Sequence, residues 1–336
     1  MGKELEYWAA NQLLNYQAGE PRVSLQKLLA GTPGGIGSVL CDPEDEFFHD
    51  AQPVPEAFEH VLAQMANVET EVDGKATVVR NPADLRRCLE SGQRFLFHCV
   101  EGAYGLGGNP DNVAALAKRG VAYVIVAHLF FRGVATCANA IPFLPDAIFE
   151  RWLNPDQDPK VGLTKLGHEI VDRLFQARIL VDITHCSDRA QADIFAIARG
   201  YPGQPVISSH NGVRGESDYP LNLSDDAVRR IADSGGVIGV ILFPHWLRRR
   251  HHQLSGADGF PLLFDTIEYL RERTGDDHIA IGSDLDGFIK PLKGCENYAE
   301  TPALVEAVQL RYGSAADKIL YQNALRVLEQ GWRGAV

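Results

Sequence analysis

The chain has 336 residues, of which 45% are hydrophobic and 23% are charged, a composition typical of a globular protein with a large core. Its 32 basic and 44 acidic residues give a net charge of −12, which argues against nucleic acid or an anionic membrane surface as a partner. No run of about eighteen apolar residues occurs, so no transmembrane helix is expected. The N-terminus lacks an apolar signal core, and the six cysteines form no C-x-x-C pair. We therefore expect reduced thiols and a cytoplasmic protein.

The first part of the chain is mainly helical by its pattern. An apolar stripe with helical spacing begins near the N-terminus and ends at Pro21. An Asn-Pro pair later in the segment is typical of the start of a helix. Helices are expected over 4–18, 25–29, 56–66 and 81–88, with a first strand over 34–41.

From residue 95 onward, short apolar runs alternate with amphipathic segments. Strands are expected over 95–100, 121–127, 179–184, 205–209, 237–242 and 279–281. Helices are expected over 111–119, 163–176, 189–199, 224–233 and 262–274, then over 302–312 and 315–330. Such alternation indicates βαβ units and a parallel sheet. We predict an α/β fold of the (β/α)8 TIM-like barrel type. It would be a single domain over 1–336, with an N-terminal helical segment (1–34) and C-terminal helices (302–336).

Polar side chains recur where the expected strands end. They are Glu101, His128, His185, His210 and Asp284. Each alone is best explained as a loop residue, but closure of a parallel barrel would aim all five at one point on the same rim. Imidazole and carboxylate groups suit Zn²⁺, and the lack of cysteine among them favours a catalytic site with an open position for water. Such a water has a pKa of about 7 and can attack a carbonyl.

Two neighbouring features bear on this site. Asp284 and Asp286 lie just after the apolar run 279–281, between Gly282 and Gly287. Packing alone gives no reason for two carboxylates at the end of a buried strand. Alternation along the strands places His98 and Asp182 on the opposite face from Glu101 and His185, so we assign them to the helix–sheet layer or a supporting role.

Several segments together resemble one known family. They are Glu101-Gly102, 162–164 leading to 181–185, 205–210, 222–226, 282–287 and 323–327. In order and spacing they are similar to the membrane (renal) dipeptidase family, the M19 metallopeptidases of the amidohydrolase superfamily. The resemblance runs from about residue 25 to residue 330.

The resemblance implies a role for each matching residue. Glu101 would be the carboxylate that bridges two zinc ions, and His185 and His210 would complete the second metal. His128 would contact the substrate, and would either polarise its carbonyl or steady the tetrahedral intermediate. Asp284 would be the acid/base that moves the proton to the leaving amine, with Asp286 as a weaker candidate. Family members are often dimers, so a homodimer is also implied.

The first departure from the family is at the N-terminus. The family begins with a strand that carries a His-x-Asp pair for the first metal, and no His-x-Asp occurs in this sequence. Only seven barrel strands can be counted. Either the true start lies upstream or the lineage has lost that metal. Loss of the strand would leave unpaired backbone groups that cost roughly 1–3 kcal/mol each if buried. We therefore expect one zinc ion, and two only if a His-x-Asp precedes Met1.

The second departure concerns the substrate. Leu221 stands where the family has an arginine that is expected to hold the substrate carboxylate, and leucine cannot pair with it. Arg214 in the same loop could substitute for it as a substrate-binding residue.

Three functions are weighed. The leading hypothesis is zinc-dependent hydrolysis of a dipeptide or related small amide by metal-activated water. The alternative is a catalytically impaired relative that keeps the fold and binds one metal or none. A barrel that handles sugars or phosphates is the third, and the absence of a glycine-rich phosphate loop argues against it.

Overall fold

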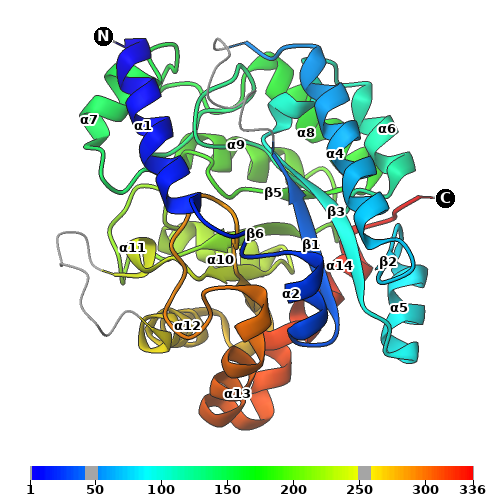
Figure 1. The fold of residues 1–336 in the computed structure, drawn as a ribbon. Coiled ribbons are helices and arrows are strands. Elements are labelled where there is room, and N and C mark those ends of the chain that lie inside the picture. Colours follow the sequence, from blue (N-terminus) through cyan, green and yellow to red (C-terminus); the bar gives the residue numbers. More distant parts are fainter. Residues whose placement is uncertain (1, 42–51, 249–258, 336) are drawn as a thin grey trace. The chain divides into compact units, whose positions relative to one another are not determined.

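The computed structural model describes residues 2–41, 52–248 and 259–335 (Figure 1). The chain divides into two compact units. Unit 1 contains residues 1–32 and 208–326, and unit 2 contains residues 33–207 and 327–336.

Unit 2 contains a run of parallel strands. β1 (Gly35–Leu40) pairs with β3 (Phe95–Glu101), and the two lie side by side in Figure 1. β3 pairs with β4 (Tyr123–Ile125), β4 with β5 (Leu180–Asp182), and β5 with the start of β6 (Val206–Asn211). The sequence prediction missed β2 (Thr77–Val78), a two-residue strand beside β3 that is too short to show a periodicity.

The helices of unit 2 begin where the sequence supplies caps. Side-chain oxygens of Asn81, Thr164 and Ser187 accept backbone N–H groups in the first turns of three helices. These helices are α5 (Pro82–Ser91), α8 (Lys165–Ala177) and α9 (Asp188–Ala198). The others are α4 (Glu56–Val72), α6 (Asn112–Arg119), the short α7 (Asp146–Ile148) and two irregular turns, η1 (Ala103–Leu106) and η2 (Phe149–Leu153).

Unit 1 contains the rest of β6, which pairs with β7 (Ile238–Ile241), and β8 (Ile279–Gly282), which pairs with β7. Its larger helices are α1 (Gly2–Gln17), α2 (Leu25–Ala30), α10 (Asp225–Asp233), α12 (Phe260–Thr274) and α13 (Thr301–Tyr312). Short elements are α11 (Pro244–Leu247), η3 (Asp276–His278), η4 (Tyr298–Glu300) and η5 (Gly313–Ala315). The last predicted helix is divided: a π-turn, η6 (Lys318–Gln322), precedes α14 (Asn323–Gly331), whose residues from Val327 onward belong to unit 2.

The strand order is β1-β3-β4-β5-β6-β7-β8, all pairs being parallel. This confirms the predicted α/β class and each of the seven predicted strands, and β2 makes an eighth strand among the described residues. β1 stands at the end of this order, and within 2–41, 52–248 and 259–335 no strand pairs with its other side. That the chain forms a single domain over 1–336 stays a prediction.

Two further expectations concern the chain as a whole. All six cysteines are free thiols. Within the described residues, no helix has both the length and the apolar character needed to cross a bilayer.

His98 lies in the layer between β3 and α4, as alternation along the strand predicts. Its ring is buried, and its Nε2 lies 3.3 Å from Oε1 of Glu69 on α4. Arg80 Nη2 lies 2.8 Å from the same carboxylate oxygen. Burial lowers the pKa of His98 below its ordinary value of 6.5, and the Glu69 carboxylate only partly offsets this.

The lowered pKa of His98 predicts a pH-dependent stability. Because the unfolded chain binds this proton more readily than the folded chain, His98 should cost stability as the pH falls below about 6.5. Chemical denaturation of the parent and of His98→Gln at about pH 7.5 and pH 5.5 measures this. The parent should lose more stability on acidification than the variant, and His168→Gln, at an exposed position, should behave like the parent. Equal losses in the parent and His98→Gln would contradict the assignment.

Candidate metal and catalytic site

Glu101 is the last residue of β3 and is buried. The strand can end there because Gly102 adopts a φ of +88°, and a Cβ at that position would lie 2.1 Å from the Tyr104 ring. A buried carboxylate is costly unless charged or polar partners surround it. The surroundings of Glu101 therefore decide what the site can do.

Two imidazoles face the Glu101 carboxylate within unit 2. His185 Nε2 lies 3.3 Å from Oε1, and His128 Nε2 lies 3.7 Å from Oε2. The two rings are perpendicular, with their centroids 4.8 Å apart. All three side chains are buried. The structure thus brings together three of the residues that the sequence singled out.

The strand register explains how residues distant in sequence meet. Glu101 is aligned with Ile125, Ile125 with Asp182, and Asp182 with Ile207. His128, His185 and His210 each follow the aligned residue of their own strand by three positions. Each of the three histidines therefore lies at the same offset beyond the aligned residue of its own strand.

His185 has a strained backbone, with a φ of +65° that a residue with a side chain seldom adopts. Its carbonyl accepts the N–H of Ala138 at 2.8 Å, and Cys186 N–H donates to the Ile183 carbonyl at 3.1 Å. Below it, Asp182 Oδ1 accepts both the N–H and the hydroxyl of Thr184, at 2.9 and 2.7 Å. Asp182 thus supports the turn that presents His185, in line with the supporting role expected of it.

Sequence reasoning missed Cys41 and Tyr104. Cys41 directly follows β1, and its Sγ lies 3.4 Å from Nδ1 of His128 and 3.4 Å from the Tyr104 hydroxyl. A contact at Nδ1 orients the ring so that Nε2 faces Glu101. One sequence signal was that Cys41 ends the expected strand 34–41, but the pairing of Leu40 with Val100 that puts Cys41 level with Glu101 is decided by the fold.

His210 lies on the part of β6 that belongs to unit 1, and it is buried. Its Nδ1 lies 3.0 Å from the Ser209 hydroxyl, and its ring stacks on Trp246 at a centroid distance of 6.4 Å. A hydroxyl at Nδ1 leaves Nε2 as the nitrogen that can bind a ligand.

Asp284 and Asp286 follow β8 in a strained turn of unit 1. Asp284, Asp286 and Phe288 have φ values of +53°, +67° and +58°. A Cβ at Gly287 would lie 2.0 Å from Oδ1 of Asp284, so the glycine leaves room for that carboxylate. The Asp286 carboxylate instead accepts the N–H groups of Arg22 and Val23, through Oδ1 and Oδ2 and at 2.8 Å each. This makes Asp286 an anchor for the segment between α1 and α2.

The donor chemistry around Glu101 fits a divalent metal. Glu101 Oε1 and His185 Nε2 face each other at 3.3 Å. Both atoms can offer a lone pair, so a proton or a cation between them would make the contact favourable. Both groups are among the ligands that zinc prefers.

Comparison with known proteins gives one consistent result. The family profile described as membrane dipeptidase (peptidase family M19) matches residues 6–332. The chain belongs to the membrane dipeptidase family M19.

Individual relatives agree with the family. The dipeptidase tcpJ of Claviceps purpurea is 24% identical over 316 residues, which are 92% of this chain and 69% of that protein. The probable dipeptidase PvdM of Pseudomonas aeruginosa superposes with a TM-score of 0.72 at 23% identity, covering 93% of this chain and 89% of that one. A metallopeptidase of Rhodobacter sphaeroides, solved with a phosphinate mimic of the dipeptide L-Ala-D-Ala, gives a TM-score of 0.74 at 22% identity, covering 94% and 91%.

Membership in family M19 establishes the chain as a metallo-dipeptidase-like hydrolase. The likeness to the solved M19 structures confirms the predicted TIM-like barrel class. A missing first strand accords with β1 standing at the end of the strand order.

The departure from the M19 pattern at Leu221 is built into the core of unit 1. Leu221 is 1% exposed, and the neighbouring Asn222 bridges three backbone groups of its own and adjacent loops. Arg214 donates from Nη2 to the Pro220 carbonyl within the same loop. Its role in substrate binding stays a prediction.

The contacts of Asp286 predict a structural role that can be measured. Asp286→Ala removes the acceptor of two backbone N–H groups and should lower the free energy of unfolding by about 2 kcal/mol. Asp286→Asn keeps one acceptor oxygen and should lose less. Denaturant titration of both variants measures the difference. Full stability of Asp286→Ala would contradict the anchoring role.

Proposed function

We propose that this protein is a zinc-dependent hydrolase of dipeptides or related small amides in which Glu101, His185 and His210 hold one ion. The observation that carries the proposal lies within unit 2: the buried Glu101 Oε1 and His185 Nε2 face each other at 3.3 Å, and both groups are of the kind that zinc prefers. The row of strand ends supports it, since His185 and His210 both follow by three positions the aligned pair Asp182 and Ile207.

When bound, such an ion polarises a carbonyl group and activates water as the nucleophile. The remaining steps belong to the chain. Glu101 supplies the negative charge that balances the cation, and Ser209 orients His210 through its Nδ1. His128, oriented by Cys41, presents an imidazole beside Glu101 that can stabilise the negative charge developing on the carbonyl oxygen.

Asp284 is proposed as the general acid/base. Its carboxylate projects from a turn at the C-terminal end of β8, where parallel α/β barrels place their chemistry. It would accept a proton from the attacking water and deliver it to the leaving amine. A dipeptide as substrate is supported by family membership and by the L-Ala-D-Ala mimic bound to the Rhodobacter relative. A cytoplasmic location and a homodimer stay predictions.

A second candidate is a relative that is catalytically impaired and binds one metal or none. The absence of any His-x-Asp from the sequence favours it, because the resemblance assigns that pair to the first of two metals. The two candidates differ in metal content and in activity.

Substitution of the proposed ligands tests the site directly. His185→Ala and His210→Ala should lose zinc and lower the rate of dipeptide hydrolysis by about a hundredfold or more, because each removes a ligand. Asp284→Asn should keep the zinc and lower kcat by about 10²- to 10⁴-fold. Rates and metal content are measured together, with His168→Ala as a control at an exposed position. Full activity and zinc content in His185→Ala would rule out this site.

Metal analysis of the parent protein separates the two candidates. Plasma mass spectrometry after growth with zinc should find about one zinc ion per chain, because only three ligands are proposed. Hydrolysis of a dipeptide panel should stop on treatment with a chelator and return with zinc. Near-zero metal together with no hydrolysis would favour the impaired relative.

A further inference from the structure

Two of the free thiols face each other across a short antiparallel bridge in unit 2. The bridge aligns Cys137 with Cys186. The N–H of the residue after Cys137 donates to the carbonyl before Cys186 at 2.8 Å, and the N–H of the residue after Cys186 donates to the carbonyl before Cys137 at 2.9 Å. The backbones of the two cysteines are therefore opposite each other without bonding each other, and in such pairs the Cα atoms approach to about 4.5 Å.

This arrangement meets the requirements of a disulfide. A disulfide joins residues whose Cα atoms lie about 4.4–6.8 Å apart. Side chains directly opposite each other in an antiparallel pair also project from the same face. Among the strand pairs and bridges of the described residues, no other one aligns two cysteines.

The contacts of the two sulfur atoms place them on the same short stretch of chain. Cys137 Sγ lies 3.7 Å from the Leu129 carbonyl oxygen, and the backbone N–H of Ala127 donates to the Cys186 sulfur. The two thiols thus contact the residues on either side of His128. This is independent of the backbone pairing and leads to the same conclusion, that the sulfurs lie close together.

Neighbouring amides hold the backbone of both cysteines in place. The Cys137 N–H donates to Gln157 Oε1 at 2.8 Å, and its carbonyl accepts Gln157 Nε2 at 3.0 Å. The Cys186 N–H donates to the Ile183 carbonyl at 3.1 Å, and its carbonyl accepts Gln191 Nε2 at 2.9 Å. A bond between the sulfurs therefore calls for side-chain rotation and not for movement of the backbone.

We propose that Cys137 and Cys186 form a modification site, at which a low-molecular-weight disulfide such as glutathione disulfide introduces a reversible S–S bond. One protein thiolate attacks the small disulfide, forms a mixed disulfide and displaces one small thiolate. The second protein sulfur then attacks the mixed disulfide and displaces the other. Two protein thiols are oxidised, one small disulfide is reduced to two thiols, and the two protons of the protein thiols end on those products.

The bond would join two segments that carry imidazoles. It would tie the segment after β4, which contains His128, to the turn after β5, which contains His185. It would also close a loop of about fifty residues, and a crosslink over such a loop stabilises the fold by restricting the unfolded chain. The inference goes beyond the proposed function and does not depend on hydrolysis.

Redox equilibration of the full chain tests the proposal. The two thiols are only 2% and 1% exposed, so exchange requires transient opening and should be slow. The protein is incubated in glutathione buffer until its composition no longer changes, quenched with acid, alkylated in denaturant and mapped by mass spectrometry. The map should contain a peptide pair linked through Cys137 and Cys186, and dithiothreitol should abolish the link. Full alkylation of both cysteines, or mixed disulfides without the link, would overturn the proposal.

Variants connect the bond to stability. Oxidation should raise the Tm of the parent by roughly 5 °C or more. It should leave the Tm of Cys137→Ser and Cys186→Ser unchanged. If these variants do not fold, the peptide map of the parent decides. An equal rise in Cys137→Ser would overturn the proposal.

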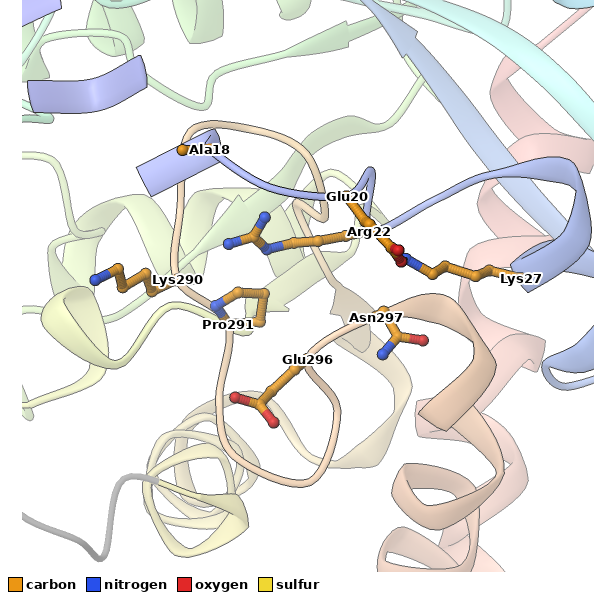
Figure 2. A pocket seen from close by; sticks show the side chains of 8 residues that line it. All are labelled: Ala18, Glu20, Arg22, Lys27, Lys290, Pro291, Glu296 and Asn297. Atoms are coloured by element: carbon orange, nitrogen blue, oxygen red, sulfur yellow. The ribbon is translucent and has the colours of Figure 1, made fainter. Parts of the chain in front are cut away.

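Cys295→Ser is the matched control. Its thiol is also buried, but it lies in unit 1, next in sequence to Glu296, which lines the pocket of about 380 Å³ in Figure 2. No bridge of the described residues aligns Cys295 with another cysteine. Cys295→Ser should therefore keep both the linked peptides and the rise in Tm, and loss of the link in this variant would contradict the assignment.

Discussion

The buried carboxylate of Glu101 is the group on which the candidate site depends. An isolated carboxylate in a protein interior costs several kcal/mol, and the chain meets this cost by placing two imidazoles within 3.3 and 3.7 Å of its oxygens. Neither histidine is near Glu101 in sequence. They reach it because β3, β4 and β5 are aligned through Glu101, Ile125 and Asp182, so equal offsets along each strand end at the same level.

Backbone strain accompanies two of the residues for which chemistry is proposed. His185 and Asp284 both adopt left-handed conformations that are unfavourable for residues with side chains. In each case neighbouring groups hold the turn: the Ala138 N–H for His185, and Gly287 for Asp284. Such conformations persist only when their surroundings fix them, and here they aim a reactive side chain in a direction that regular secondary structure does not provide.

The departure from the M19 pattern at the N-terminus bears on the number of metal ions. Without a His-x-Asp pair, the proposed donor set amounts to one carboxylate and two imidazoles, which suits a single ion. The Asp286 carboxylate accepts the backbone N–H groups of Arg22 and Val23 and so joins the N-terminal segment of unit 1 to the loop after β8. Of the two carboxylates, Asp286 thus makes a structural contact, and Asp284 is the one proposed as the general acid/base.

The sequence by itself determined the α/β class, the seven strands of the main order and the identity of Glu101, His128 and His185 as strand-end residues. It could do so because apolar runs that alternate with amphipathic segments report the period of each element, and a polar residue that ends such a run is conspicuous. Only the tertiary structure decided that Cys41 contacts His128, that Asp286 anchors Arg22, and that the last helix contains a π-turn. These depend on register, turn geometry and contacts across 87 and 264 residues of chain, and no local pattern encodes them.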